Sequence, residues 1–135
     1  MLLSIPQRGF SQSEFEQRTQ KAQRIMNDEK LDAILLTTEP NVRYFSGFLT
    51  QFWLSPTRPW FLIVPREGEL IAVIPEIGRA GMESTWVNDI RTWDSPCPED
   101  DGISLLSQAL SEVTLSFGRI GMAPGQESYL RMPAN

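Results

Sequence analysis

Two apolar runs joined by a short polar connection constrain the fold more than any other feature of this sequence. The runs are residues 60–64 (WFLIV) and 70–74 (LIAVI), and the connection PREGE contains a glycine. Short runs rich in β-branched and aromatic residues favour strands, and a five-residue connection with glycine joins such strands in a hairpin. The sequence therefore predicts a β-hairpin in the middle of the chain.

Helical patterns surround this hairpin. Ser11 with Glu14 and Ser13 with Glu16 form two overlapping capping boxes ahead of an amphipathic stretch that ends near residues 28–30. Pro40 suits the start of a short helix and Gly47 its end. Residues 103–113 place apolar side chains on one helical face, and residues 76–84 form a weaker helical pattern because of their glycines.

Further strands are predicted at residues 33–37, 86–93 and 119–122. The first of these, AILLT, is continuously apolar, which suits a strand covered on both faces. Residues 94–102 read as a loop, in which Asp101 is expected to cap the helix that follows. We expect an α/β fold with a mixed sheet of about five to six strands and helices on both faces.

Composition excludes several classes of function. The 135 residues suit a single domain spanning 1–135, and 12 basic against 17 acidic residues leave a net charge of −5, with no basic cluster for nucleic acid. The chain has no histidine, so it cannot build a Ser-His-Asp triad or a common zinc site. The single Cys97 fits a reducing compartment. No run is long enough to cross a membrane and no signal peptide is evident, so we expect a cytoplasmic protein.

Several motifs together resemble the N-terminal part of the creatinase/prolidase/aminopeptidase P superfamily, the pita-bread enzymes. Residues 31–36 (LDAILL) match its first strand, and residues 41–48 (NVRYFSGF) match a turn of the form N-(I/V)-x-Y-x-(T/S)-G-F. The hairpin and the RIGM segment follow in the same order, so the resemblance covers residues 15–132. It implies a non-catalytic domain, because nothing in these residues corresponds to the family's catalytic part. Residues 124–135 show no closing element, so we expect a domain cut from a longer chain.

The resemblance also implies partners and a cofactor for the parent enzyme. Full-length members carry a C-terminal catalytic domain, and the peptidases hold two divalent ions there (Mn, Zn or Co) on two Asp, one His and two Glu. No cofactor is expected within the present residues. The N-terminal domain contributes to a homodimer and lends a loop to the pocket for a small peptide or small acid.

The segment at the position of that loop is residues 49–60 (LTQFWLSPTRPW), which we call the aromatic loop. Arg58 can hold a substrate carboxylate with the planar fork of its guanidinium. Trp53 can wall the pocket or hold an onium group by cation–π attraction, and Tyr44 is a further candidate for substrate contact. The residues beside Trp53 suggest that it is partly exposed, and we expect the loop to be mobile without its partner domain.

Three alternatives stay open at this point. The parent can be an Xaa-Pro aminopeptidase or dipeptidase, or a creatinase-like enzyme or superfamily lyase acting on a small onium acid. The domain can instead be a peptide- or protein-binding module of a catalytically degenerate relative. A stand-alone enzyme is disfavoured, because without histidine no nucleophile–base pair is evident.

Overall fold

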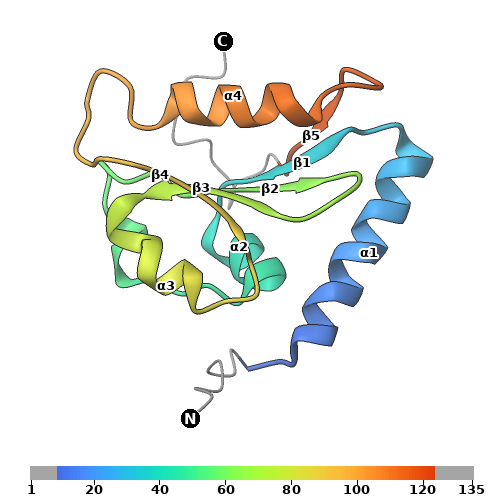
Figure 1. Cartoon of the computed structure of the whole chain (residues 1–135), viewed down its shortest axis with the longest axis horizontal. Coiled ribbons are helices and arrows are strands. Elements are labelled where there is room, and N and C mark those ends of the chain that lie inside the picture. Colours follow the sequence, from blue (N-terminus) through green and yellow to red (C-terminus); the bar gives the residue numbers. More distant parts are fainter. Residues whose placement is uncertain (1–8, 124–135) are drawn as a thin grey trace.

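The computed structural model describes residues 9–123, which form a five-stranded mixed sheet with helices on both faces (Figure 1). The strands are β1 (Ala33–Leu36), β2 (Phe61–Pro65), β3 (Ile71–Pro75), β4 (Asp89–Trp93) and β5 (Ile120–Gly121). The helices are α1 (Gln12–Glu29), α2 (Glu39–Ser46), α3 (Arg79–Glu83) and α4 (Ile103–Val113), with 3-10 turns η1 (Gln51–Leu54) and η2 (Glu76–Gly78). The predicted α/β class is confirmed.

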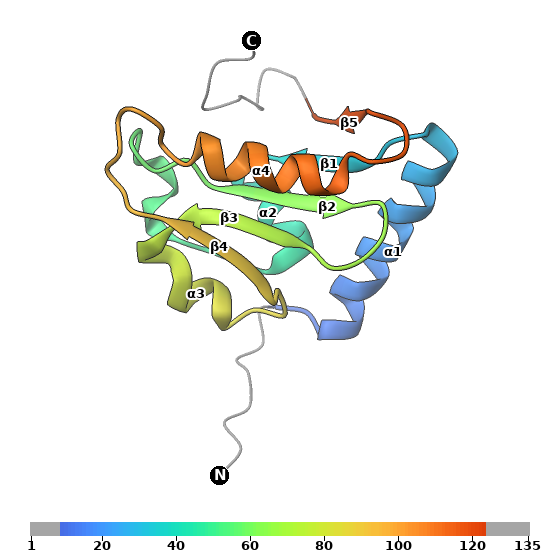
Figure 2. The same ribbon diagram turned by 45° about the horizontal axis from the view of Figure 1, so that its top comes forward.

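The predicted hairpin forms the centre of the sheet. The strand order is β4-β3-β2-β1-β5, and β2 and β3 pair antiparallel with Phe61 opposite Val73 and Ile63 opposite Ile71 (Figure 2). Every residue of both strands is buried, which explains why neither run alternates with polar residues. The two strands predicted from apolar runs, β2 and β3, are therefore covered on both faces.

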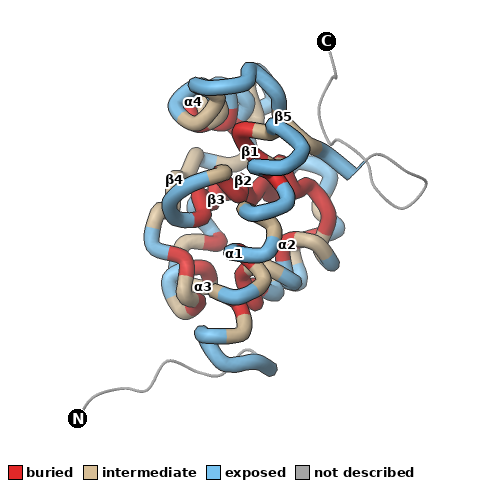
Figure 3. Tube along the Cα trace, turned by 90° about the vertical axis from the view of Figure 1, so that its right-hand side faces the viewer, coloured by how far each residue is buried: buried red, intermediate tan, exposed pale blue. Residues whose placement is uncertain are grey.

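Alternate residues of the hairpin face two separate cores. Leu62 and Val64 lie in the larger core, which also contains Met26 of α1, Val42 of α2 and Met82 of α3. Phe61, Ile63, Ile71 and Val73 face the other side, where they meet Leu106 and Ala109 of α4. Figure 3 shows the buried strands between the exposed outer surfaces of the helices. The two-fold period of a strand thus places one hairpin in both cores.

Most of the expected helix ends are confirmed. The Ser11 hydroxyl accepts a hydrogen bond from the Glu14 amide, and Lys30 closes α1 in the left-handed conformation. Gly47 closes α2 with φ 75°, a region that favours glycine. The second capping box does not form, because Ser13 lies inside α1.

The cap of α4 differs from the prediction. Both carboxylate oxygens of Asp100 accept the Ser104 amide, at 3.0 and 3.3 Å, whereas Asp101 adopts φ 50°. Asp100 therefore caps the start of α4. Asp101 lies in the turn before the helix, where both Asp101 and Gly102 adopt the left-handed conformation. The prediction for residues 124–135 lies outside the described residues.

Four of the five strands run in the same direction. β1 pairs antiparallel with β2 and parallel with β5, while β3 pairs antiparallel with β2 and parallel with β4. The carboxyl ends of β1, β3, β4 and β5 consequently lie along one edge of the sheet. In open α/β sheets, ligands bind outside this edge.

Candidate functional site

The aromatic loop lies at this carboxyl edge, because it leads into β2, the one strand of opposite direction. Two other segments meet it there. The Ser95 hydroxyl, in the loop after β4, donates to the Thr57 carbonyl at 3.0 Å. Gly78, just after β3, lies against the ring of Trp60. Three segments that are distant in the sequence therefore assemble one surface.

Trp53 anchors the aromatic loop to the larger core. Its side chain is 5% exposed, and its ring stacks on Trp60 with centroids 6.2 Å apart and planes inclined by 20°. The Thr50 hydroxyl caps η1 by accepting the Phe52 amide, and this turn directs Trp53 inward. The expectation of a partly exposed Trp53 was wrong, whereas the expected mobility of the loop stays a prediction. Burying the large indole face stabilises the folded loop within its own chain.

Arg58 is the cation of the aromatic loop. Its Nη1 donates to the Ser55 hydroxyl at 3.1 Å, and its guanidinium carbon lies 5.5 Å from the centre of the Phe52 ring. Arg58 is half-buried, yet no ion pair between the described residues includes it.

Other half-buried arginines differ in this respect. Arg66, Arg79 and Arg91 each lie within 4.0 Å of a carboxylate oxygen. The Arg58 guanidinium keeps further N–H donors beside the one given to Ser55, so it can accept a carboxylate from outside the domain.

Tyr44 belongs to a different cluster. Its ring is 50% exposed and lies 4.4 Å beneath the Arg18 guanidinium, which also stacks 4.2 Å from Phe10. Arg18 also donates to the Tyr44 carbonyl at 2.8 Å, so it ties α1 to α2. The structure therefore brings Trp53 and Arg58 together in one loop and places Tyr44 in the contact between α1 and α2.

A second polar group at the carboxyl edge was not predicted. Arg79 donates to Glu76 at 2.9 Å, and the Thr92 hydroxyl at the end of β4 donates to the same carboxylate. The hydrogen bond from Arg79, followed by that from Thr92, holds the pKa of Glu76 below its usual value. The spacing of Glu76 and Arg79 on one helical turn is a signal in the sequence. The approach of Thr92 depends on β3–β4 pairing and leaves no such signal.

Residues 9–123 bring together no group of three or more His, Cys, Asp or Glu side chains that could hold a metal ion. Within the same residues, no helix has the length and apolar character needed to cross a bilayer. The polar groups described at this edge are the Arg58 guanidinium and the ion pair between Glu76 and Arg79, and they lie beside aromatic rings.

The fold and the edge define the class of the protein, an α/β domain that presents a cationic aromatic loop at the carboxyl ends of its strands. The family model described as the creatinase/prolidase N-terminal domain matches residues 18–132. The chain therefore belongs to this family, as its motifs predicted. Among curated proteins, no relative matches the sequence.

Solved structures share the fold. Dipeptidase PepE from Mycobacterium ulcerans aligns with a TM-score of 0.61 at 22% identity, covering 76% of this chain and 27% of that one. A recombinant prolidase from Thermococcus sibiricus aligns with a TM-score of 0.64 at 18% identity, covering 82% of this chain and 34% of that one. This chain thus spans about a third or less of these two proteins.

A shorter relative has nearly the same extent. It is the creatinase/prolidase N-terminal domain of an X-Pro dipeptidase from Streptococcus pyogenes, with a TM-score of 0.58 and 10% identity. The alignment covers 78% of this chain and 92% of that one. At these identities the likeness establishes the fold alone.

Proposed function

We propose that this chain is the non-catalytic N-terminal domain of a metal-dependent hydrolase that shapes the substrate pocket with its aromatic loop. The parent would be an Xaa-Pro aminopeptidase or dipeptidase, or a creatinase-like enzyme. The structural neighbours support this choice, since they are a dipeptidase, a prolidase and the N-terminal domain of an X-Pro dipeptidase. The observation that carries the proposal is Arg58, a half-buried arginine of the carboxyl edge that joins no ion pair among residues 9–123.

The three candidate residues have different roles. Arg58 binds the carboxylate of a small peptide or small acid, and Phe52 and Ser55 hold the guanidinium in place. Trp53 acts as a positioning residue, because its buried ring fixes the loop on Trp60. Tyr44, half exposed at the end of α2, is the candidate for contact across subunits or with the far end of a longer substrate.

The remaining parts of the function belong to the parent enzyme. As the family resemblance implies, two divalent ions (Mn, Zn or Co) would lie in a C-terminal catalytic domain of the parent. The parent would form a homodimer in the cytoplasm, in which the aromatic loop completes a pocket. Chemistry at the metals is thus the task of the catalytic domain, and substrate orientation is the task of this one.

Steady-state kinetics of the full-length gene product test the proposal. We expect Arg58→Ala to lower kcat/KM at least tenfold on Xaa-Pro dipeptides or on small onium acids, a loss of about 1.4 kcal/mol of transition-state stabilisation. Arg58→Lys should recover only part of the activity, because an ammonium lacks the planar fork. Arg43→Ala, an exposed arginine of α2, is the matched control and should leave kcat/KM unchanged.

Two other results would contradict the proposal in different ways. Unchanged kinetics of Arg58→Ala in a dimeric, metal-loaded enzyme would mean that the aromatic loop contributes to packing and not to substrate binding. A full-length product without bound metal or hydrolytic activity, which binds basic peptides in a salt-dependent manner, would identify a binding module instead.

A further inference from the structure

The peptide unit between Thr57 and Arg58 is held at both of its polar atoms. The Ser95 hydroxyl, in the loop after β4, donates to the Thr57 carbonyl at 3.0 Å. The Arg58 amide donates to the Ser55 carbonyl at 3.4 Å. The second bond lies within the aromatic loop, whereas the first comes from a distant part of the sequence. Ser95 therefore ties the backbone beside Arg58 to the end of β4.

The guanidinium of Arg58 is held by the same short turn. Its Nη1 donates to the Ser55 hydroxyl at 3.1 Å, and that hydroxyl lies 3.3 Å from the Thr57 hydroxyl. The centre of the Phe52 ring lies 5.5 Å from the guanidinium carbon. Because Ser55 contacts both the amide and the guanidinium of Arg58, a shift of this turn would move the whole side chain. The bond from Ser95 opposes such a shift.

Two prolines restrict the same turn further. Pro56 follows Ser55, whose backbone is extended with φ −68° and ψ 124°, and the buried Pro59 follows Arg58. The helical region is disfavoured for a residue before proline, so Ser55 and Arg58 have few backbone conformations. The loop thus loses little conformational entropy when a ligand binds to the guanidinium. The aromatic loop also contains no acidic residue that could compete for this cation.

We infer that Ser95 is a positioning residue, which holds the Arg58 guanidinium in register with the free carboxylate of the substrate. The inference rests on the proposed function, in which Arg58 binds that carboxylate. A bidentate pair needs both carboxylate oxygens opposite the N–H groups of one planar guanidinium, so it depends on the placement of the arginine. By fixing the Thr57 carbonyl, Ser95 favours substrates with a free carboxylate over their neutral amides, which leave part of the guanidinium unpaired.

Steady-state kinetics of the full-length gene product test this role on two compounds. One is the substrate that the enzyme hydrolyses, an Xaa-Pro dipeptide or a small onium acid, and the other is the amide of the same compound. We expect Ser95→Ala to raise KM for the free acid about three- to tenfold, the range expected for one hydrogen bond. The KM for the amide should stay unchanged.

The split between KM and kcat separates positioning from a general loss of structure. The carboxylate keeps its charge during the reaction, so its contact with Arg58 is equal in the ground and transition states. Ser95→Ala should therefore leave kcat nearly unchanged. Ser95→Thr keeps the hydroxyl and should restore the KM of the wild type.

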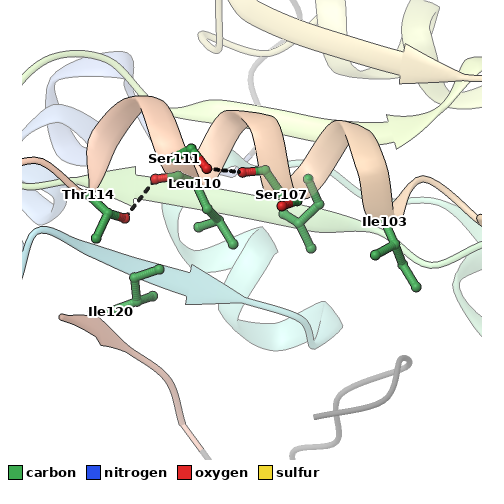
Figure 4. A pocket seen from close by; sticks show the side chains of 7 residues that line it. Ile103, Ser107, Leu110, Ser111, Thr114 and Ile120 are labelled. Atoms are coloured by element: carbon green, nitrogen blue, oxygen red, sulfur yellow. Dashed lines mark hydrogen bonds between the residues drawn. The ribbon is translucent and has the colours of Figure 1, made fainter. Parts of the chain in front are cut away.

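Ser111→Ala is the matched control, because the Ser111 hydroxyl also donates to a backbone carbonyl, that of Ser107, at 2.9 Å (Figure 4). Both residues belong to α4, where they line an open apolar groove of about 550 Å³ between α4 and β5, together with Leu110 and Ile120 (Figure 4). This variant removes a bond of the same kind outside the aromatic loop. Both KM values should therefore equal those of the wild type.

The double variant shows whether Ser95 acts through Arg58. Adding Ser95→Ala to Arg58→Ala should raise KM no further, because no guanidinium is left to position. Additive losses, or equal losses on the acid and the amide, would overturn the inference, since Ser95 would then support the loop as a whole.

Failure of this inference and failure of the proposed function give different results. An unchanged KM for Ser95→Ala, beside a raised KM for Arg58→Ala, would overturn this inference alone. Unchanged kinetics for Arg58→Ala, or a full-length product without hydrolytic activity, would remove the proposed function as well.

Discussion

Gly78 lies directly against the indole ring of Trp60: a Cβ at position 78 would lie 2.2 Å from Cζ3 of that ring. Trp60 is 1% exposed and stacks on Trp53, so the ring has no free space to move into. The close approach of this glycine joins the turn after β3 to the aromatic loop. The position of the loop at the carboxyl edge thus depends on the absence of a side chain at residue 78.

Gly78→Ala should destabilise the domain by about 1–3 kcal/mol, because the added methyl group overpacks a filled core. Urea unfolding of the 135-residue chain measures the change. Gly81→Ala is the control in the same region, since its Cβ would approach only Phe48 Cε2, at 3.1 Å. The gain in helix propensity should offset that tight contact. Equal losses of unfolding free energy in the two variants would show that the Trp60 ring can move away from the added methyl group.

Trp53→Ala should cost about 3–5 kcal/mol of unfolding free energy, as expected for a large buried aromatic residue. The loss reflects the stacking on Trp60 and the burial of the indole. Leu54→Ala is the matched control, since the Leu54 side chain is 83% exposed. A Trp53→Ala domain as stable as wild type would mean that the loop does not depend on this anchor.

Asp32→Asn should remove part of the acid sensitivity of the fold. Burial alone would raise the pKa of Asp32, but the amides of Phe117, Gly118 and Ser116 donate to its carboxylate and together hold the pKa below the ordinary 3.8. The ionised form is therefore favoured in the folded state. Its stabilising effect is complete above the ordinary value and is lost as the pH falls below 3.8 through the depressed native pKa.

Unfolding midpoints at neutral pH and near pH 3 test this linkage. The Asp32→Asn variant should be less stable than wild type at neutral pH, with a smaller further loss in acid. Asp94→Asn, at an exposed position, should follow the wild-type profile. Parallel pH profiles for wild type and Asp32→Asn would contradict the assignment.

Asp100→Ala should lower the thermal stability of the domain, because it removes the acceptor of the Ser104 amide at the start of α4. Asp101→Asn should have little effect, since asparagine tolerates the left-handed conformation found there. Thermal unfolding by circular dichroism compares the two variants. A larger loss of thermal stability from Asp101→Asn than from Asp100→Ala would identify Asp101 as the helix cap.

Local patterns predicted the elements closely. The apolar runs at residues 60–64 and 70–74 correspond to β2 and β3, and Ser11, Pro40 and Gly47 mark helix ends as expected. Each of these signals lies within a few neighbouring residues, so the sequence alone contains it. The family resemblance rested on the same local motifs and their order, and the match over residues 18–132 confirms it.

The environment of single side chains was harder to predict. The residues beside Trp53 suggest a partly exposed side chain, yet its ring stacks on the buried Trp60 and is itself buried. In the same way, Thr92 reaches Glu76 only because β3 pairs with β4. Long-range strand pairing sets these contacts, and no sequence window contains it.

The sequence by itself determined the strands, the helices, the family and the lack of histidine chemistry, because these depend on composition and on local spacing. Only the tertiary structure decided that Arg58 joins no ion pair among the described residues, that Tyr44 lies apart, and that β5 leaves an apolar groove open. The physical reason is that burial and ion pairing depend on which distant segments meet. That outcome is set by the packing of the whole sheet and its helices.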